Sequence, residues 1–397
     1  MLCQAPRVTV GDHIAEGRRT TLEAGDGTRE LARIDLDPTT IDALVVRGEP
    51  WGSSTVAELF ARHGGLGLVV LHQGCLAYER VGPDGDPDRR NLNFSVTKSF
   101  TGSLAATATA HGRLARDARV ADLIPELAAT GFADATVGEI ADMTAAIAYD
   151  EDYDEATAPS SRSGWRGFGD YMVAIGLDGA DGADGVDRPR TIRDLLGTIG
   201  RGERPHGEVF AYATPMSDVL GWLLEHADGR DGGDVLQDVW SAVGAEHDAR
   251  LTRDPAGTAL MGAGLAMTTR DLARFGALVN DLVRGRVDLV AGPDDEPLLD
   301  GRVLDAIRDR GDPEAFQRGG HYAYLAGYSY RDQWWLPGGA GRPLSAWGIH
   351  GQVLWIDPDA DVVIAYHCGG PLPSEPRRDL EQDALCRAVV EASAGWA

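Results

Sequence analysis

The chain has 397 residues, of which 43% are hydrophobic and 25% are charged, values typical of a soluble globular protein that is long enough for two lobes with separate cores. Its formal net charge of -25 makes nucleic acids and acidic membrane surfaces unfavourable partners, because both carry negative charge themselves. The simplest interpretation of this acidity is solubility, and the alternative is an acidic rim that attracts a cationic substrate.

The positions of the cysteines and the length of the apolar runs argue against further classes of protein. Cys3, Cys75, Cys368 and Cys386 are scattered and form no CxxC pair, so they predict neither a disulfide framework nor a zinc site. The N-terminus lacks a charged start followed by an apolar run, and no stretch approaches the ~20 apolar residues of a membrane span. HExxH, GxSxG and GxGxxG motifs are absent as well. We therefore expect a cytoplasmic protein that needs no metal or cofactor.

The first predicted elements lie between the N-terminus and residue 112. Residues 1–60 are polar and irregular, with a short helix expected in TTIDALVV (39–46). Two β-rich runs, Leu66–Leu71 and Leu76–Arg80, flank the turn residues His72-Gln73-Gly74 and predict a hairpin. An acidic, turn-rich linker follows. From Ser95 to about residue 112 the chain has helical propensity and small residues nearly all round, which predicts a helix buried between two layers.

The rest of the chain alternates helical patterns, loops and late strands. Residues 115 to about 290 mix short helices with Gly/Asp-rich loops, and GLDGADGADGVD (176–187) is too polar to pack and is predicted to be mobile. Strand character returns in three segments, and the tight turn DPDAD joins the last two as an antiparallel hairpin: 322–336, 345–357 and 361–368. An amphipathic helix at 377–393 can cover one face of the sheet.

Strands at both ends of the chain, with helices inserted between them, predict a split α/β (α+β) lobe and a mostly helical lobe. We expect residues 1–60 to form an N-terminal extension with the first helix. Residues 61–95 and 320–397 should form the sheet lobe, and residues 96–319 the helical lobe, with an active site between the two.

The stretch NFSVTKSF contains the only lysine of the chain, Lys98, whereas the other 36 basic residues are arginines. Ser95 lies three residues earlier, which places both side chains on one face of the predicted helix, near its N-terminus. Serine is a weak nucleophile that needs a base, and a buried lysine can lose its proton whereas arginine cannot. We interpret Lys98 as the base for Ser95. The alternative is that the spacing arose by chance. With 14 serines in 397 residues, a serine is expected three residues before a lone lysine roughly 1 time in 30.

Two further residues are candidates for the same site. Tyr212 precedes a predicted helix whose apolar face contains Val219, Leu220, Leu223 and Leu224; it is either a packing residue or a phenol that relays protons to a leaving group. His350 is expected on a strand in GIHGQVLWIDP, where alternation points its side chain opposite to its neighbours. A backbone N–H of that strand, together with the N–H of Ser95, could form an oxyanion hole.

Together these stretches resemble the serine β-lactamase and penicillin-binding-protein superfamily. The similarity is greatest to the class C β-lactamase-like esterases and amidases, the branch that contains the 6-aminohexanoate-dimer (nylon-oligomer) hydrolases. It runs from about residue 60 to the C-terminus, in the same order, through SVTK, YDEDY, SGWR, FAYATPMSDVLGW, TTRDLARFG, RDQWW and GIHGQVLWIDP. The resemblance implies a β-lactamase-like fold, in which helices flank an antiparallel sheet.

The resemblance also implies roles for individual residues. Ser95 would be the acylated nucleophile, Lys98 its general base and Tyr212 the proton relay, while the amides of Ser95 and Ile349 would form the oxyanion hole. The expected substrate-binding positions are Tyr153, a loop tyrosine that would touch the substrate amide, together with Gly262, His350 and three tryptophans that line the cleft or belong to the aromatic core: Trp165, Trp334 and Trp335.

Departures from the family pattern bear on the substrate. The lactamase branch has Tyr-x-Asn where this chain has Tyr212-Ala213-Thr214, and Lys-Thr-Gly where this chain has His350-Gly351-Gln352. Because the Lys-Thr pair grips the β-lactam carboxylate, we do not expect β-lactam hydrolysis. Gly262 stands where the nylon-oligomer hydrolases have a larger polar residue near the substrate's amine end, which argues against nylon oligomers as substrates.

Three functions remain at this stage. The first is a serine hydrolase that forms an acyl-enzyme from a small amide or ester and releases the acyl group to water. The second is an acyltransferase that passes the same acyl group to an amine or alcohol in natural-product biosynthesis. The third is a catalytically silent binding scaffold, which the retained Lys98 and Tyr212 disfavour. The oligomeric state is not predicted.

Overall fold

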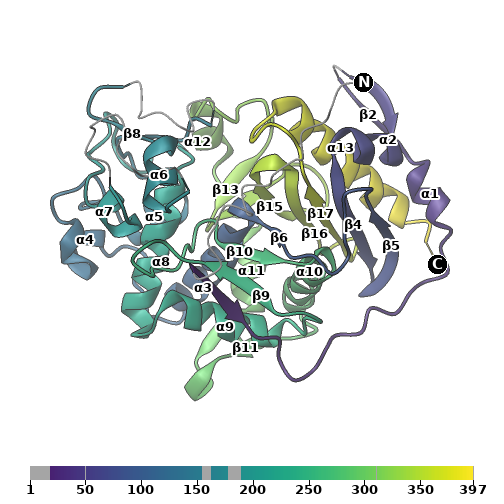
Figure 1. The fold of residues 1–397 in the computed structure, drawn as a ribbon, viewed down its shortest axis with the longest axis horizontal. Coiled ribbons are helices and arrows are strands. Elements are labelled where there is room, and N and C mark those ends of the chain that lie inside the picture. Colours follow the sequence, from purple (N-terminus) through teal and green to yellow (C-terminus); the bar gives the residue numbers. More distant parts are fainter. Residues whose placement is uncertain (1–17, 50, 154–161, 178–188, 310, 397) are drawn as a thin grey trace.

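The structure is a computed structural model that describes residues 18–49, 51–153, 162–177, 189–309 and 311–396. Its centre is a seven-stranded sheet in which every neighbouring pair is antiparallel, with the order β13-β14-β15-β16-β17-β4-β5. The strands are β4 (Gly65–His72), β5 (Cys75–Val81), β13 (Ser329–Arg331), β14 (Trp334–Leu336), β15 (Leu344–Gly348), β16 (Gln352–Asp357) and β17 (Val362–Cys368). Segments from both ends of the chain therefore share one sheet (Figure 1).

Side-chain alternation along the strands builds a separate core on each face of this sheet. On one face, Leu68 and Val70 of β4 pack in the same cluster as residues of α1 (Pro38–Asp42), α2 (Val56–Arg62) and α13 (Pro376–Ser393). On the other face, Val69 and Leu71 belong to the larger cluster that contains α3 (Thr97–Ala110) and α10 (Thr269–Val283). The C-terminal helix thus covers one sheet face, as its sequence pattern predicts.

The central helix α3 is surrounded by other elements, and every residue from Thr97 to Ala108 is buried. Phe100 stacks on Phe275 of α10, with 3.5 Å between ring centroids. A short 3₁₀ turn, η3 (Phe94–Val96), precedes α3 directly. The small side chains of TGSLAATATA allow this close packing, which confirms the prediction of a helix between two layers.

Of the remaining helices, α4 to α8 lie together on the side of the molecule away from α1 and α2, and α11 lies beside α10 (Figure 1). The remaining helices are α4 (Val120–Leu123), α5 (Val137–Ala141), α6 (Phe168–Ala174), α7 (Ile192–Leu196), α8 (Thr214–Asp228), α9 (Gly232–Ala242), α11 (Gly301–Ile307) and α12 (Pro313–Arg318), with the 3₁₀ turns η4 (Pro125–Leu127) and η5 (Pro293–Asp295). None of the helices in the described ranges combines the length and apolar character that crossing a membrane demands.

Several elements differ from the sequence-based expectation. The helix expected in 39–46 ends at Asp42, and a hairpin of β2 (Val45–Gly48) and β3 (Gly52–Thr55) follows it. A second antiparallel sheet was not predicted: β1 (Arg19–Leu22), β9 (Ala249–Thr252), β10 (Leu265–Met267) and β6 (Asn91–Leu92). The short pairs β7 (Tyr149–Asp150) with β8 (Arg166–Gly167) and β11 (Leu289–Ala291) with β12 (Pro297–Asp300) were not predicted either. Most of the glycine-rich loop 176–187 lies outside the described residues.

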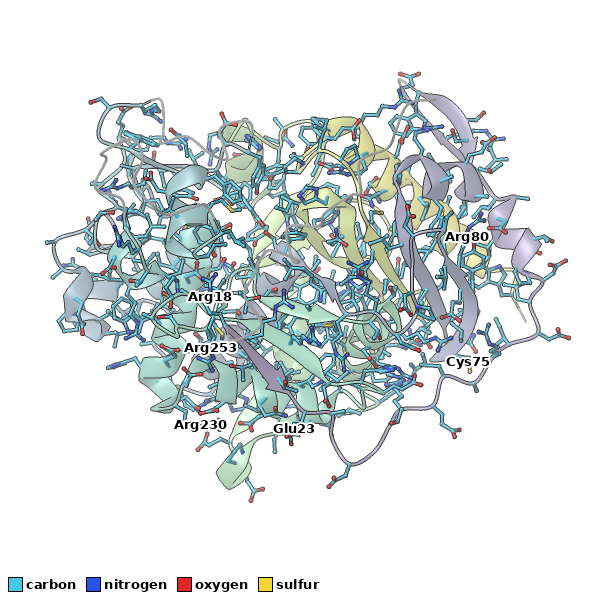
Figure 2. The ribbon with its side chains drawn as sticks, viewed as in Figure 1. Arg18, Glu23, Cys75, Arg80, Arg230 and Arg253 are labelled. Carbon is cyan, nitrogen blue, oxygen red and sulfur yellow. The ribbon has the colours of Figure 1, made fainter. Side chains whose placement is uncertain are left out.

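Ion pairs between arginines and carboxylates connect neighbouring segments at the surface. Figure 2 labels two of these arginines, Arg230 and Arg253. Arg253 forms a two-pronged pair with Asp231, and Arg230 bridges Asp228 and Asp238 of neighbouring helices. Planar guanidinium groups suit such bidentate contacts better than ammonium groups do. Arginine therefore suits those positions of this chain where a permanent positive charge pairs with a carboxylate.

Candidate active site

The serine–lysine pair lies at the junction of η3 and α3. Ser95 is in η3 and Lys98 is in the first turn of α3, so both side chains project from the same side of the chain. The Lys98 Nζ donates to Ser95 Oγ at 3.0 Å. Only 1% of Lys98 is exposed, which makes it one of the largest fully buried side chains of the described residues. The two groups are thus in direct contact inside the protein.

The ammonium of Lys98 has three hydrogen-bond acceptors, and all of them are uncharged. Besides Ser95, Nζ donates to Thr214 Oγ1 at 3.1 Å and to the carbonyl oxygen of Gly262 at 2.7 Å. Burial lowers the pKa of Lys98 to about 8, although the negative charges of Glu151 and Asp218 act in the opposite direction. A neutral amine is therefore accessible near neutral pH, which a general base requires.

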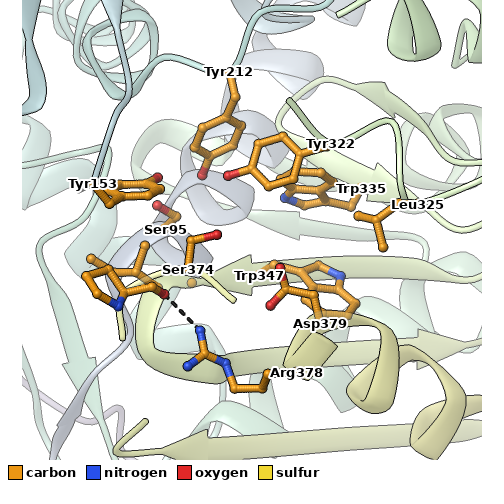
Figure 3. Close-up of a pocket in the computed structure, with 13 residues that line it drawn as sticks. Ser95, Tyr153, Tyr212, Tyr322, Leu325, Trp335, Trp347, Ser374, Arg378 and Asp379 are labelled. Atoms are coloured by element: carbon orange, nitrogen blue, oxygen red, sulfur yellow. Dashed lines mark hydrogen bonds between the residues drawn. The ribbon is translucent and has the colours of Figure 1, made fainter. Parts of the chain in front are cut away.

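Tyr212 is placed by the start of α8, two residues before its first residue Thr214. Its ring centroid lies 5.4 Å from Lys98 Nζ, and its hydroxyl points toward Ser95 (Figure 3). Burial raises the pKa of Tyr212 well above its ordinary value, so the phenol stays protonated and can donate. The structure brings Ser95, Lys98 and Tyr212 together, although they are far apart in sequence.

Glu151 is a component that the sequence analysis did not identify. Its carboxylate accepts the backbone N–H of Thr214 at 2.8 Å and the Thr214 hydroxyl at 2.5 Å. Because the hydroxyl proton points to Glu151, the Thr214 oxygen presents its lone pairs to Lys98. The Tyr153 hydroxyl donates to the same carboxylate at 3.3 Å. Glu151 is the third residue of YDEDY, a motif from which only the last tyrosine, Tyr153, was expected at the site.

A pocket opens over Ser95 and includes several predicted residues (Figure 3). Its void, including the open mouth, measures about 420 Å³. Tyr212, Tyr322 and Trp335 form one aromatic wall, with ring centroids between 4.9 and 5.6 Å apart. The full lining consists of Ser95, Tyr153, Tyr212, Tyr322, Leu325, Trp335, Trp347, Gly348, Ile349, Pro373, Ser374, Arg378 and Asp379. Such a mixture of aromatic and a few polar groups is typical of small-molecule sites.

The neighbourhood of residues 349–351 differs from the expected strand. Ile349–Gly351 is a 3₁₀ turn, η6, between β15 and β16, and His350 has a positive φ of 63°. Its ring leaves the pocket, since Nδ1 contacts the Gly370 carbonyl at 2.8 Å and the imidazole packs on Phe94. Ile349, in contrast, lines the pocket together with Ser95. The expectation that His350 sits on a strand and contacts substrate therefore needs correction, because the turn rotates its side chain away.

Two tryptophans and Gly262 also lie apart from the pocket lining. Trp334 is fully buried and donates to Ser103 Oγ at 3.0 Å, because strand alternation points it opposite to Trp335. Trp165 packs against the guanidinium of Arg162. Gly262 is buried beside Lys98, where its carbonyl is an acceptor, and it is not among the residues that line the pocket over Ser95.

Pocket residues from the C-terminal segment were also missed by the sequence analysis. Asp379 of α13 lines the pocket, accepts the Tyr324 hydroxyl at 2.6 Å, and has a pKa that burial raises to about 6. Arg378 holds the preceding loop by donating to the carbonyls of Leu372 and Pro373 (Figure 3). Both belong to a helix that the sequence marks only as amphipathic, so no local signal distinguished them.

A buried serine–lysine pair lies at the start of a central helix, beside an antiparallel sheet, as the resemblance to serine hydrolases of the penicillin-recognising type implies. A family model described as beta-lactamase matches residues 53–387, and the chain therefore belongs to the beta-lactamase family. This finding confirms the resemblance that the sequence motifs indicated.

Individual relatives agree with this membership. The chain is 33% identical over 295 residues to the 6-aminohexanoate-dimer hydrolase of Paenarthrobacter ureafaciens, covering 72% of this chain and 68% of that protein. A Bacillus anthracis structure provisionally assigned as a 6-aminohexanoate-dimer hydrolase superposes with a TM-score of 0.78 at 22% identity, over 96% of this chain and 91% of that chain. EstCE1, a hydrolase with promiscuous acyltransferase activity, gives a TM-score of 0.58 at 15% identity, over 83% and 96% of the two chains. The two structures show the shared fold.

Proposed function

We propose that this protein is a Ser-Lys-Tyr hydrolase that forms an acyl-enzyme from a small amide or ester and releases the acyl group to water. The observation that carries the proposal is the buried Lys98 amine, which lies 3.0 Å from the Ser95 hydroxyl and is bonded only to uncharged acceptors. The similarity to a 6-aminohexanoate-dimer hydrolase supports hydrolysis as the reaction class.

In the proposed acylation step, Ser95 Oγ attacks the substrate carbonyl carbon while its proton passes to the neutral Lys98 amine. The carbonyl oxygen becomes an oxyanion, which the backbone N–H groups of Ser95 in η3 and Ile349 in η6 stabilise. The proton then passes through the Tyr212 hydroxyl to the leaving amine or alcohol as the carbonyl–heteroatom bond breaks.

In the deacylation step, water attacks the ester formed on Ser95 and gives its proton to the same Lys98–Tyr212 pair. The collapse of the second tetrahedral intermediate returns that proton to Ser95 Oγ and releases the acid. Glu151 keeps Thr214 oriented as an acceptor for Lys98 throughout. We propose hydrolysis before acyl transfer, since the relative that is 33% identical to this chain is a hydrolase.

Acyl-enzyme formation tests this proposal directly. Incubation with a p-nitrophenyl ester followed by intact-mass analysis should show one added acyl group, located on Ser95 by peptide mapping. Ser95→Ala should remain unmodified, whereas Ser374→Ala, which removes another serine of the same pocket, should still form the adduct. The absence of an adduct with any activated acyl donor would favour the silent scaffold. Amines or alcohols that outcompete water at millimolar concentration would favour the transferase.

The proposed base is tested by Lys98→Arg. Because arginine keeps its proton in proteins, we expect kcat/KM to fall by about 100-fold or more, the size of a general-base contribution. Stopped-flow measurement of p-nitrophenol release would record the loss, and circular dichroism would confirm that the variant is folded. Near-normal turnover of the folded variant would remove Lys98 from the mechanism.

A further inference from the structure

Asp218 is a buried carboxylate that the proposed reaction does not use. It lies on α8, one helical turn after Thr214, and only 5% of it is exposed. Its Oδ1 accepts the backbone N–H of Gly262 at 3.2 Å, while the carbonyl oxygen of the same Gly262 accepts Lys98 Nζ at 2.7 Å. One residue, Gly262, therefore connects this carboxylate to the proposed base.

The second oxygen of Asp218 makes the arrangement unusual. Among the buried polar atoms of the described residues, Asp218 Oδ2 has no hydrogen-bond partner within 3.5 Å, and the Tyr171 hydroxyl interacts with this carboxyl group and acts to lower its pKa. The residue also lines a small cavity between α7 and α8, whose rim includes Arg193 and Glu225. An incompletely satisfied buried carboxylate is costly to the folded state, so a purely structural reason for keeping it is weak.

We propose that Asp218 is a positioning residue, which orients Lys98 through the Gly262 peptide and opposes the loss of its proton. The inference rests on the proposed function, in which Lys98 must be neutral to accept the proton of Ser95. Two constraints act on the base in opposite directions: burial favours the neutral amine, whereas the carboxylate favours the ammonium. Asp218 thereby sets where the amine sits and how basic it is.

The electrostatics of the cluster agree with this geometry. Burial raises the pKa of Asp218 to about 7, while the charge of Lys98 acts to lower it, and Asp218 in turn raises the pKa of Lys98. The other titratable groups that face the pair are Glu151, Tyr149 and Tyr171, together with the Tyr212 ring. Burial raises the pKa of each of these three tyrosines, so they stay neutral and the carboxylates dominate the field at Lys98.

Because Lys98 is the only lysine, its protonation can be measured in the intact protein without any activity. Protein labelled with [13Cε]lysine and free of lysine-containing tags should give one lysine signal, whose shift against pH reports the amine. We expect Asp218→Asn, which retains an acceptor for Gly262 but removes the charge, to lower the midpoint by about one pH unit. Glu225→Gln, on the same helix and cavity, should leave the midpoint unchanged. An unchanged midpoint in Asp218→Asn would overturn the proposal.

A second variant separates orientation from charge. Asp218→Ala removes the acceptor as well, so kcat at the alkaline plateau should fall by about tenfold while that of Asp218→Asn stays within roughly threefold of the wild type. If Asp218 had only a structural role, both variants would have a lower melting temperature, and kcat would fall by the same factor at every pH with no change in the midpoint of the profile. That result would contradict the proposal. If no acyl-enzyme forms on Ser95 but the lysine midpoint still moves, the proposed function fails and the Asp218–Lys98 coupling stands.

Discussion

At the scale of single residues, the contrast between one lysine and 36 arginines follows from what each side chain can do. Arginine forms the bidentate surface pairs, such as Arg253 with Asp231, and it stays charged wherever it is placed. Position 98 differs because its acceptors are two hydroxyls and a carbonyl, and its burial penalises a permanent charge. Only a basic side chain that can lose its proton suits this environment.

The pH dependence of activity follows from the same residue. Burial lowers the pKa of Lys98 to about 8, and the base works only when it is neutral, so activity must rise as the pH increases through that value. At pH 7 only about one-tenth of the molecules would carry the neutral amine. With an uncharged ester as substrate, kcat/KM against pH should therefore show a rising limb with a midpoint near 8. A midpoint at the ordinary lysine value would mean that the amine is not desolvated in solution.

The proposed catalytic residues could be selected from the sequence because each carries a local signal. Ser95 and Lys98 are three residues apart, and Tyr212 directly precedes a helix with a clear apolar face. Glu151 and Asp218 lacked such a signal, since their roles depend on contacts with Thr214 and Gly262 that only the folded chain creates. Positions that act through tertiary hydrogen bonds leave no pattern in a single sequence.

At the scale of elements, the site depends on how closely the segment around Gly262 approaches α8. A Cβ atom at position 262 would lie 3.1 Å from Thr214 Cγ2, 3.2 Å from Ser217 Cβ and 3.3 Å from Asp218 Oδ1, all tighter than ordinary contacts. The absence of a side chain therefore lets the Gly262 carbonyl reach Lys98. The sequence comparison related this glycine to substrate choice, whereas the structure relates it to helix packing.

Gly262→Ala tests this packing. We expect the extra methyl group to push the segment away from α8, to destabilise the protein by about 1–3 kcal/mol, and to lower kcat by roughly tenfold because Lys98 loses an acceptor. Gly200→Ala is the matched control, since its Cβ would meet only Ala148 Cβ at 3.8 Å. Thermal unfolding and turnover measured on both variants would show whether position 262 must lack a side chain. Full activity in a stably folded Gly262→Ala protein would contradict it.

The turn at η6 shows why element boundaries were harder to predict than elements. The single strand expected over 345–357 is instead two antiparallel strands, β15 and β16, joined by a 3₁₀ turn at Ile349–Gly351. His350 in this turn adopts a left-handed conformation that non-glycine residues seldom take. The alternation rule that fixed the strands fails at such a residue. The hairpin of β4 with β5 and that of β16 with β17 were predicted correctly because turn residues mark their ends.

At the scale of the whole molecule, the net charge of -25 creates a long-range field that a charged substrate meets before it reaches the pocket. The pocket itself carries both signs, since Arg378 and Asp379 are adjacent in its lining. The preference of the pocket for a charged substrate and the attraction of that substrate by the net charge are therefore separate properties, and they respond differently to salt. Added salt reduces the Debye length from ~10 Å at 0.1 M to ~3 Å at 1 M, which screens the field but not direct contacts.

The two interpretations of the acidity make different predictions for matched p-nitrophenyl esters that carry a quaternary ammonium, a carboxylate or no charge. If the field guides substrates, kcat/KM for the cationic ester should fall by several-fold between ~0.02 M and ~0.5 M NaCl, and that for the anionic ester should rise by a similar factor. The neutral ester corrects for effects of salt on the chemical step. Parallel salt dependences for all three esters would leave solubility as the sole consequence of the charge, because a field that does not change local substrate concentration has no kinetic effect.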